Sequence, residues 1–248
     1  MLLKNRFFFA LSLMCGVAAC TKTTVDSNPQ TSYTDYYTVN VGQSMLYRLD
    51  SVALLDFGAD TVTHTYWQKD SVMSVTTDLE GGLQYNVNSY IKPYEGNTDW
   101  SYLTSYRVMP KEQTLEITDE DNLRFIKLAS PVSDGFSWDG NAPFMKDYNP
   151  GSSDPLVIYQ GWNYQYTNKD SVLELSTGTF SNTVTVTEKD EENMPFDPTN
   201  FYARSLAVES YAKGIGLVHR KRLFLTWQSS GHVGYEPTSY GVELTRVQ

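Results

Sequence analysis

The sequence contains little cysteine and little histidine. Its 248 residues include only Cys15 and Cys20, both near the N-terminus, and the three histidines His64, His219 and His232. A chain cut before Cys20 would keep one thiol, which excludes an internal disulfide, and a domain of about 210 residues has a large enough core to fold without one. The histidines are far apart and lack zinc-ligand spacing, so no metal site is expected.

Recognisable catalytic motifs are also missing. No Gly-x-Ser-x-Gly sequence occurs, and the run from Ser229 to His232 has suitable residue types without a triad geometry. Gly214 and Gly216 lack the third glycine and the strand-to-helix setting of a phosphate-binding loop. The sequence therefore predicts no catalytic residue and no cofactor, and it favours a non-enzymatic protein.

Positive charge is scarce. The chain has 19 lysines and arginines against 29 aspartates and glutamates, a formal net charge of -10, and losing Lys4 and Arg6 with the N-terminal segment would make it -12. Such an excess repels phosphate backbones and anionic lipid surfaces, which argues against nucleic-acid binding. Two acidic runs, Asp119–Asn122 and Asp190–Asn193, match no calcium loop. We expect both to be solvated hairpin turns.

The first twenty residues have the layout of a bacterial export signal. Met1–Arg6 is short and basic, and Phe7–Ala19 carries no charge. Thirteen residues rise only about 20 Å as a helix, whereas a hydrocarbon core is about 30 Å thick, so a transmembrane span is not expected. The tetrad Val17–Cys20 (VAAC) resembles the lipobox of bacterial lipoproteins.

In bacterial lipoproteins the lipobox cysteine is acylated and the peptide is cut just before it. The resemblance implies that Cys20 becomes the first residue and carries a stable lipid anchor, because several acyl chains act together. The alternative is cleavage elsewhere, with Cys20 as a chance thiol. We expect a signal peptide over 1–19, a flexible tether over 20–36 and a β domain over 37–248. The anchor would hold this domain at the outer membrane, with the periplasmic side as the expected placement and the cell surface as the alternative.

Short runs of alternating apolar and polar residues follow from Tyr36 onward. Aromatic residues, which favour strands, make up 14% of the chain. Leu83–Ile91 and Thr183–Thr187 are clear examples of the alternation. Phe201–Lys213 is compatible with a helix or a strand, and its alternation favours a strand. We predict an all-β fold, a single antiparallel domain with a strongly curved sheet, as a half-barrel or a sandwich.

A connection rich in proline and glycine, from Ala129 to Pro155, interrupts these runs. We expect a long mid-domain loop that caps the sheet rather than a boundary between subdomains. A curved open sheet has a concave side that must be filled. This loop and the segment 194–205 are the expected fillers, and a ligand is another.

Two blocks near the C-terminus resemble a signature of uncharacterised lipoproteins of the Bacteroidota. They are Phe180–Asp190 and Glu209–Val218, the second of which contains the letters YAKGIGLV. Val41–Tyr47 and Pro131–Trp138 are similar to two earlier blocks of such proteins. The resemblance implies a curved antiparallel sheet. That family has no established activity, so the resemblance implies no catalytic residues.

The aromatic row Trp162, Tyr164 and Tyr166 is the candidate ligand-binding feature. Period-2 spacing puts the three rings on one face of a strand. Exposed, they would form a stacking platform for sugar rings or a partner; buried, they would be one side of the core, and the sequence leaves both open. We expect a lipoprotein that binds a hydrophobic or glycan ligand, or an envelope protein, on its curved sheet. The alternatives are a hydrolase of envelope or imported polymers and a structural subunit of an outer-membrane complex.

Overall fold

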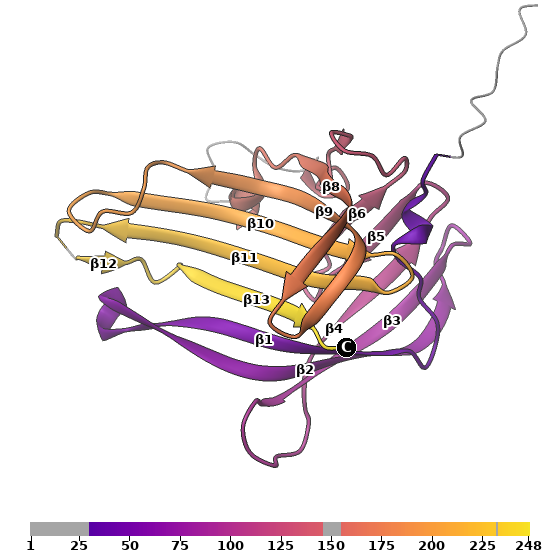
Figure 1. Cartoon of the computed structure of the whole chain (residues 1–248), viewed down its shortest axis with the longest axis horizontal. Coiled ribbons are helices and arrows are strands. Elements are labelled where there is room, and N and C mark those ends of the chain that lie inside the picture. The colour runs from indigo at the N-terminus through magenta and orange to yellow at the C-terminus, as the bar shows by residue number, and fades with distance from the viewer. Residues whose placement is uncertain (1–29, 146–154, 232) are drawn as a thin grey trace, which may run out of the picture.

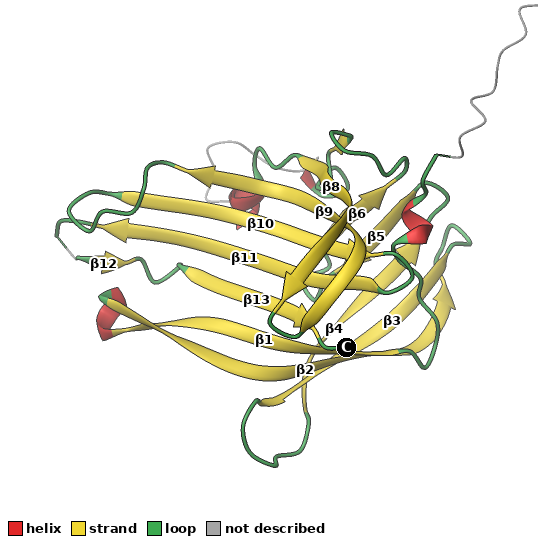
Figure 2. Cartoon of the chain, viewed as in Figure 1, coloured by secondary structure: helices red, strands yellow, loops and turns green. Residues whose placement is uncertain are grey.

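The computed structural model describes residues 30–145, 155–231 and 233–248. Figure 2 shows that strands dominate these residues. The strands are β1 (Ser44–Leu55), β2 (Asp60–Thr77), β3 (Leu83–Pro93), β4 (Ser101–Pro110), β5 (Thr114–Thr118), β6 (Arg124–Ala129), β7 (Ser137–Trp138), β8 (Tyr164–Leu175), β9 (Gly178–Glu192), β10 (Tyr202–Ala212), β11 (Gly216–Gln228), β12 (Gly234–Tyr235) and β13 (Tyr240–Arg246). The short 3-10 helices are η1 (Tyr33–Asp35), η2 (Asp56–Gly58) and η4 (Pro155–Tyr159).

The strands form one antiparallel sheet that curls strongly (Figure 1). Its order is β6-β5-β4-β3-β2-β1-β13-β11-β10-β9-β8-β7, with β12 paired to β11. The two ends of this order meet, because the Ile126 amide of β6 donates to the Gly140 carbonyl beyond β7 at 2.8 Å. The Trp138 indole donates to the Ile126 carbonyl, also at 2.8 Å. The predicted all-β fold with a strongly curved sheet is therefore confirmed.

The alternation in the sequence decides which side chains enter the concave side of the sheet. In β9, Val184, Val186 and Glu188 point inward and are buried, whereas Asp190 further along the strand is exposed. The predicted turn at Asp119–Asn122 joins β5 to β6. The predicted turn at Asp190–Asn193 starts later, because β9 continues to Glu192.

The ambiguous segment 201–213 is a strand, as its alternation favours. It forms β10 and pairs with β11 and β9. The expectation that 194–205 fills the concave side is wrong. β9 and β10 extend as a long hairpin to one end of the sheet (Figure 1), and there the loop between them leaves Met194, Phe196 and Phe201 exposed.

Other segments fill the concave side. In the described part of the mid-domain loop, Val132 and Asn141 are buried, so the capping role predicted for this loop holds there. Tyr33 and Tyr36 are also buried, so the last residues of the predicted tether belong to the folded part. Residues 1–29, including the predicted signal peptide and Cys20, lie outside the described residues.

Candidate functional site

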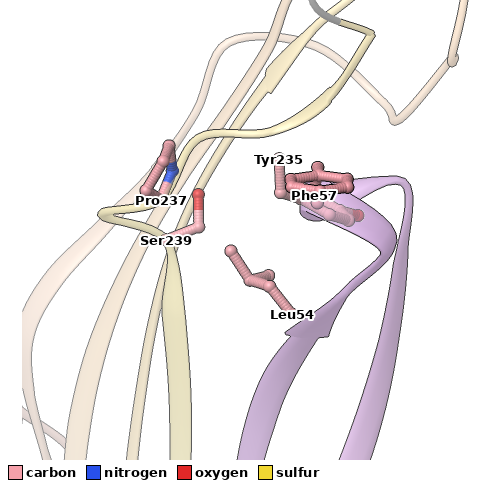
Figure 3. Close-up of a pocket in the computed structure, with 6 residues that line it drawn as sticks. Leu54, Phe57, Tyr235, Pro237 and Ser239 are labelled. Carbon is pink, nitrogen blue, oxygen red and sulfur yellow. The ribbon is translucent and has the colours of Figure 1, made fainter.

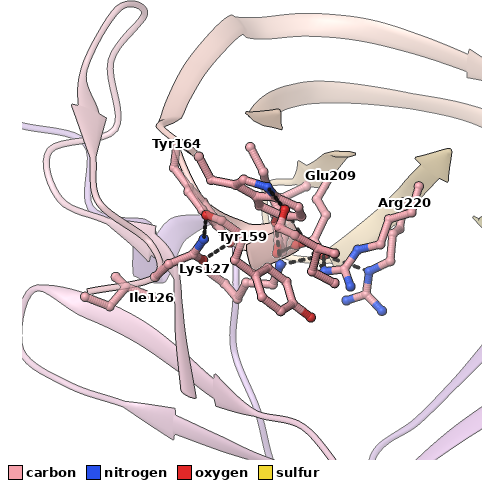
Figure 4. Close-up of polar contacts among 12 residues, drawn as sticks. Ile126, Lys127, Tyr159, Tyr164, Glu209 and Arg220 are labelled. Carbon is pink, nitrogen blue, oxygen red and sulfur yellow. Dashed lines mark hydrogen bonds and ion pairs between the residues drawn. The ribbon is translucent and has the colours of Figure 1, made fainter. Parts of the chain in front are cut away.

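Five charged side chains from four strands converge inside the curved sheet, and Figure 4 labels Lys127, Glu209 and Arg220 among them. We call them the interior cluster: Lys127 of β6, Glu188 of β9, Glu209 of β10, and Arg220 and Arg222 of β11. The members that share a strand occupy alternate positions, which places them on one face. Their charges sum to one excess positive charge.

Lys127 links the two acids of the interior cluster. Its ammonium contacts Glu188 Oε1 and lies 3.0 Å from Glu209 Oε1. The side chains of Lys127, Glu188 and Glu209 are only 3%, 0% and 1% exposed. Removing one partner of such a buried pair leaves an uncompensated charge, which costs far more than losing a surface pair. The lysine therefore holds β6 against β9 and β10.

Glu209 is held in its charged form. Burial acts to raise its pKa, but Arg220, Lys127 and Arg222 outweigh burial, so the pKa of Glu209 lies well below its usual range. The Tyr211 hydroxyl donates a hydrogen bond to Glu209 Oε2, and burial raises the pKa of Tyr211 well above its usual value. Glu209 is therefore an acceptor at every contact and a poor proton donor.

The two arginines differ in how many partners they have. Arg220 donates from Nε to Glu209 Oε1 at 2.7 Å. Arg222 donates no hydrogen bond to any described residue; its Nη2 lies 3.6 Å from Glu188 Oε2 and 3.8 Å from Glu209 Oε1. Its Nε atom is buried and has no partner among the described residues. A guanidinium carries five N–H donors, so Arg222 keeps unused capacity for an anion.

The arginines line a cavity of about 330 Å³ inside the sheet. A quarter of the side-chain surface of Arg222 is accessible, because the side chain borders this cavity. Apolar and aromatic side chains form part of the wall: Leu103, Tyr106, Ile117, Phe125 and Tyr159. The acidic residues Asp119, Glu120 and Asp121 of the β5–β6 turn line it as well. This volume lies at the lower end of the range for small-molecule sites.

Asp70 of β2 is a further buried acid on this cavity. Its Oδ1 accepts from Gln68 Nε2 at 2.9 Å and from Ser89 Oγ at 2.6 Å, and its Oδ2 accepts from the Tyr106 hydroxyl at 3.1 Å. All three donors are neutral, and no lysine, arginine or histidine pairs with Asp70 in the described chain. A carboxylate has room for about four hydrogen bonds, so Asp70 can accept another.

The aromatic row predicted from the sequence lies in the core. Trp162, Tyr164 and Tyr166 are 6%, 0% and 0% exposed. The Tyr164 hydroxyl donates to Asn141 Oδ1 at 3.0 Å, and the Tyr166 hydroxyl donates to the Ala129 carbonyl at 2.8 Å. The rings share one side of the sheet, but the capping loop covers them. They form no exposed stacking platform.

A second, more apolar cavity lies at the end of β1 (Figure 3). β13 pairs with β1 only from Tyr47 to Val52, so the last residues of β1 have no neighbour on that side. The opening has a volume of about 610 Å³ and is lined by Leu54, Phe57, Gly58, Tyr235, Pro237 and Ser239. Gly58 and Gly234 close its outer end by backbone contact, since an added Cβ on Gly58 would lie 2.1 Å from the Tyr235 carbonyl oxygen. We call this opening the apolar window.

The remaining sequence candidates that the structure describes do not converge on a reactive centre. His64 is exposed, His219 contacts Glu243 at 2.9 Å, and His232 lies outside the described residues. Within the described ranges, no three histidine, cysteine, aspartate or glutamate side chains gather as a metal site requires. None of the helices in these ranges has the length and hydropathy of a membrane span.

The interior cluster was not predicted from the sequence, where Glu188 and Glu209 stood out only as members of the blocks Phe180–Asp190 and Glu209–Val218. The available signal was a charged residue at a position where the alternation demands an inward side chain. Glu188 continues the series Val184 and Val186, and Arg220 and Arg222 are spaced by two on β11. A charge on an inward position indicates a buried network, although it does not identify the partners.

Comparisons with known proteins identify no family. No protein-family model matches the chain, and no curated protein matches its sequence. Among solved structures, it is similar to a putative exported protein with a YmcC-like fold from Bacteroides fragilis. That match has 12% identity and a TM-score of 0.37, and it covers 85% of this chain and 96% of the other. Nothing about a ligand or an activity follows from a likeness of this degree.

Proposed function

We propose that this protein is an exported, lipid-anchored envelope protein that holds a small anionic ligand inside its curved sheet. The observation that supports this most is Arg222, which lines the cavity, whose Nε atom is buried and has no hydrogen-bond partner among the described residues, and whose contacts with Glu188 and Glu209 are as long as 3.6 and 3.8 Å. A buried donor without a partner costs roughly 1–3 kcal/mol, and more when it is charged. A carboxylate or phosphate would satisfy it with charge-assisted hydrogen bonds.

The placement of the protein rests on its first twenty residues. The basic start, the uncharged stretch and the lipobox-like tetrad ending at Cys20 favour export followed by acylation. The anchor would keep the binding domain at the outer membrane. Replacing Cys20 with alanine should leave protein that takes up no radiolabelled palmitate, whereas normal labelling of this variant would rule out the anchor without affecting the cavity.

Binding is a better fit than hydrolysis. A hydrolase that uses paired carboxylates needs one of them protonated near neutral pH, as a general acid. Glu209 has the opposite tendency, because its cationic neighbours lower its pKa, and Lys127 already bridges it to Glu188. The acids of the interior cluster therefore act as counter-ions for the arginines.

The test is calorimetric titration of the full-length chain in mild detergent with hexanoate, an anion small enough for the cavity. We expect binding to weaken at least tenfold in Arg222→Gln, because charge-assisted hydrogen bonds are worth about 1.5–3 kcal/mol. Lys221→Gln is the matched control. Lys221 is the neighbouring residue on the opposite face of β11, where it pairs with Glu243 at 3.0 Å, and it does not line the cavity.

The two variants carry the same change of charge, so long-range electrostatics affects both equally. Unchanged affinity in Lys221→Gln with a large loss in Arg222→Gln would support the proposal. Equal losses in the two variants, or hexanoate binding that is indifferent to both, would refute a site at Arg222.

A further inference from the structure

The cavity is lined by an arginine that has an unused hydrogen-bond donor and by an aspartate that has no cationic partner within the described ranges. Arg222 has a buried Nε donor without a partner among the described residues and only the long contacts of 3.6 and 3.8 Å to Glu188 and Glu209. Asp70, in contrast, is a buried carboxylate with only neutral donors. Both line the same cavity of about 330 Å³. A simple anion would satisfy the arginine and leave the acid without a cation. We propose that the ligand is a small zwitterion, whose anionic group binds Arg220 and Arg222 and whose ammonium group binds Asp70.

The acids of the β5–β6 turn independently favour a ligand with a positively charged end. Asp119, Glu120 and Asp121 are consecutive on the β5–β6 turn and line the same cavity. Burial raises the pKa of Asp119, and its neighbours Glu120 and Asp121 raise it further, so negative charge is crowded there. None of the three forms an ion pair within the described residues. This turn repels a plain anion and attracts an ammonium group.

The existing hydrogen bonds of these acids and of Asp70 show which carboxylate oxygens are available to accept from an ammonium group. Asp119 uses Oδ1 to accept from the amides of Asp121 and Leu123, at 3.0 Å and 2.9 Å, which fixes the turn. Glu120 and Asp121 have no such side-chain bonds in the described chain and are free to meet an incoming cation. Asp70 is held rigidly by three donors, which suits it to be the final acceptor.

The wall between the charged ends suits a short hydrocarbon spacer. Leu103, Ile117 and Phe125 line the cavity together with the Tyr106 and Tyr159 rings. Apolar contact of this kind favours a flexible methylene chain but does not orient it. The two charged ends therefore set the direction of the ligand, and the spacer length sets the affinity.

The inference rests on the proposed function, and a matched set of probes separates the two. The full-length chain in mild detergent is titrated with hexanoate, hexylamine and 6-aminohexanoate, which share one chain length and differ in their charged ends. The shorter 4-aminobutanoate and the longer 8-aminooctanoate cover other spacings. We expect the best ω-amino acid to bind at least tenfold more tightly than the monocarboxylate of its own length, and also more tightly than hexylamine.

Substitutions in the cavity then test which residues bind the ammonium end of the ligand and which bind its carboxylate. Asp70→Asn should remove the preference for 6-aminohexanoate over hexanoate and should not weaken hexanoate binding. Because Asp70 is buried, circular dichroism must show that this variant folds. The double change Glu120→Gln with Asp121→Asn should weaken 6-aminohexanoate binding and strengthen hexanoate binding. Its matched control is Glu95→Gln with Asp99→Asn, two exposed acids outside the cavity lining.

Three outcomes are distinct. A tenfold preference for the ω-amino acid that disappears in Asp70→Asn or in the turn variant supports the zwitterion. Equal or tighter binding of the plain carboxylates overturns the zwitterion and leaves the arginine site standing. Absence of binding by every probe, in a chain shown to be folded, overturns both proposals.

Discussion

The two faces of β11 carry similar charges in opposite settings. On the inner face, Arg220 and Arg222 meet Glu188 and Glu209, which are fully buried. On the outer face, His219 and Lys221 meet Glu243, whose side chain is 36% exposed. A shift of one residue along the strand separates these settings. The comparison teaches that the face of the strand determines the role of a charged residue. An inward-facing charge joins a buried network beside the cavity, whereas an outward-facing charge forms a weak surface ion pair.

The largest expected effect on stability comes from removing Lys127, the residue at the centre of the interior cluster. Lys127→Met removes the cation that both buried acids share, so we expect a loss of about 3–5 kcal/mol in the free energy of unfolding. Urea unfolding followed by tryptophan fluorescence measures it. Lys221→Met on the outer face is the control and should cost about 1 kcal/mol at most. Similar losses in the two variants would contradict the comparison.

Arg220→Gln should have the next largest effect. It removes the 2.7 Å bond from Arg220 Nε to Glu209, a charge-assisted hydrogen bond worth about 1.5–3 kcal/mol. The same urea experiment measures the change. A loss of unfolding free energy smaller than that of Lys221→Met would mean that the bond from Arg220 to Glu209 does not stabilise the fold.

On the outer face of β11, the charge of Glu243 makes a smaller contribution to stability, and this contribution depends on pH. Hydrogen bonding from His219 lowers the pKa of Glu243 from 4.5 to about 2, and burial partly opposes this. The charged form therefore stabilises the fold fully above pH 4.5, and this contribution disappears as the pH falls towards 2. We expect Glu243→Gln to cost at most about 1 kcal/mol at pH 7, because the pair is partly exposed.

Thermal unfolding of the chain and of Glu243→Gln between pH 7 and pH 2.5 checks this prediction. The difference between the two should shrink steadily below pH 4.5. A difference that is constant over the whole range would show that the charge on Glu243 does not stabilise the fold.

The smallest expected effect on stability belongs to the residue proposed to matter most for binding. Arg222→Gln removes the cost of an unsatisfied donor and also removes the two long ion pairs with Glu188 and Glu209, so the two effects should offset each other and change the free energy of unfolding by less than about 1 kcal/mol, in either direction. Urea unfolding in the absence of ligand measures it. A loss as large as that of Lys127→Met would assign Arg222 a structural role.

Much of the fold could be predicted because each strand carries its own periodic signal. Thr183–Thr187 and the hairpin turn at Asp119–Asn122 were recognisable from local sequence, and the alternation in Phe201–Lys213 correctly favoured a strand, which the structure shows as β10. The prediction that the segment 194–205 fills the concave side was wrong because the position of this segment depends on the length of the β9–β10 hairpin. Local sequence marks the strand but not where it ends.

The candidate site was harder to predict because it is assembled from distant strands. Lys127 and Glu188 are 61 residues apart in the chain, and nothing local to either indicates the other. The aromatic row Trp162, Tyr164 and Tyr166 was correctly placed on one face, but its exposure depends on the loop that covers it. Periodicity determines which residues share a face; packing determines whether that face is open.

A crystal structure of the chain grown with 6-aminohexanoate would test the central claim most directly. The account predicts a carboxylate oxygen within about 3.2 Å of Arg222 Nε, inside the cavity that Arg220 also lines. A cavity that stays empty at saturating probe concentration, or a probe that binds only in the apolar window, would contradict it.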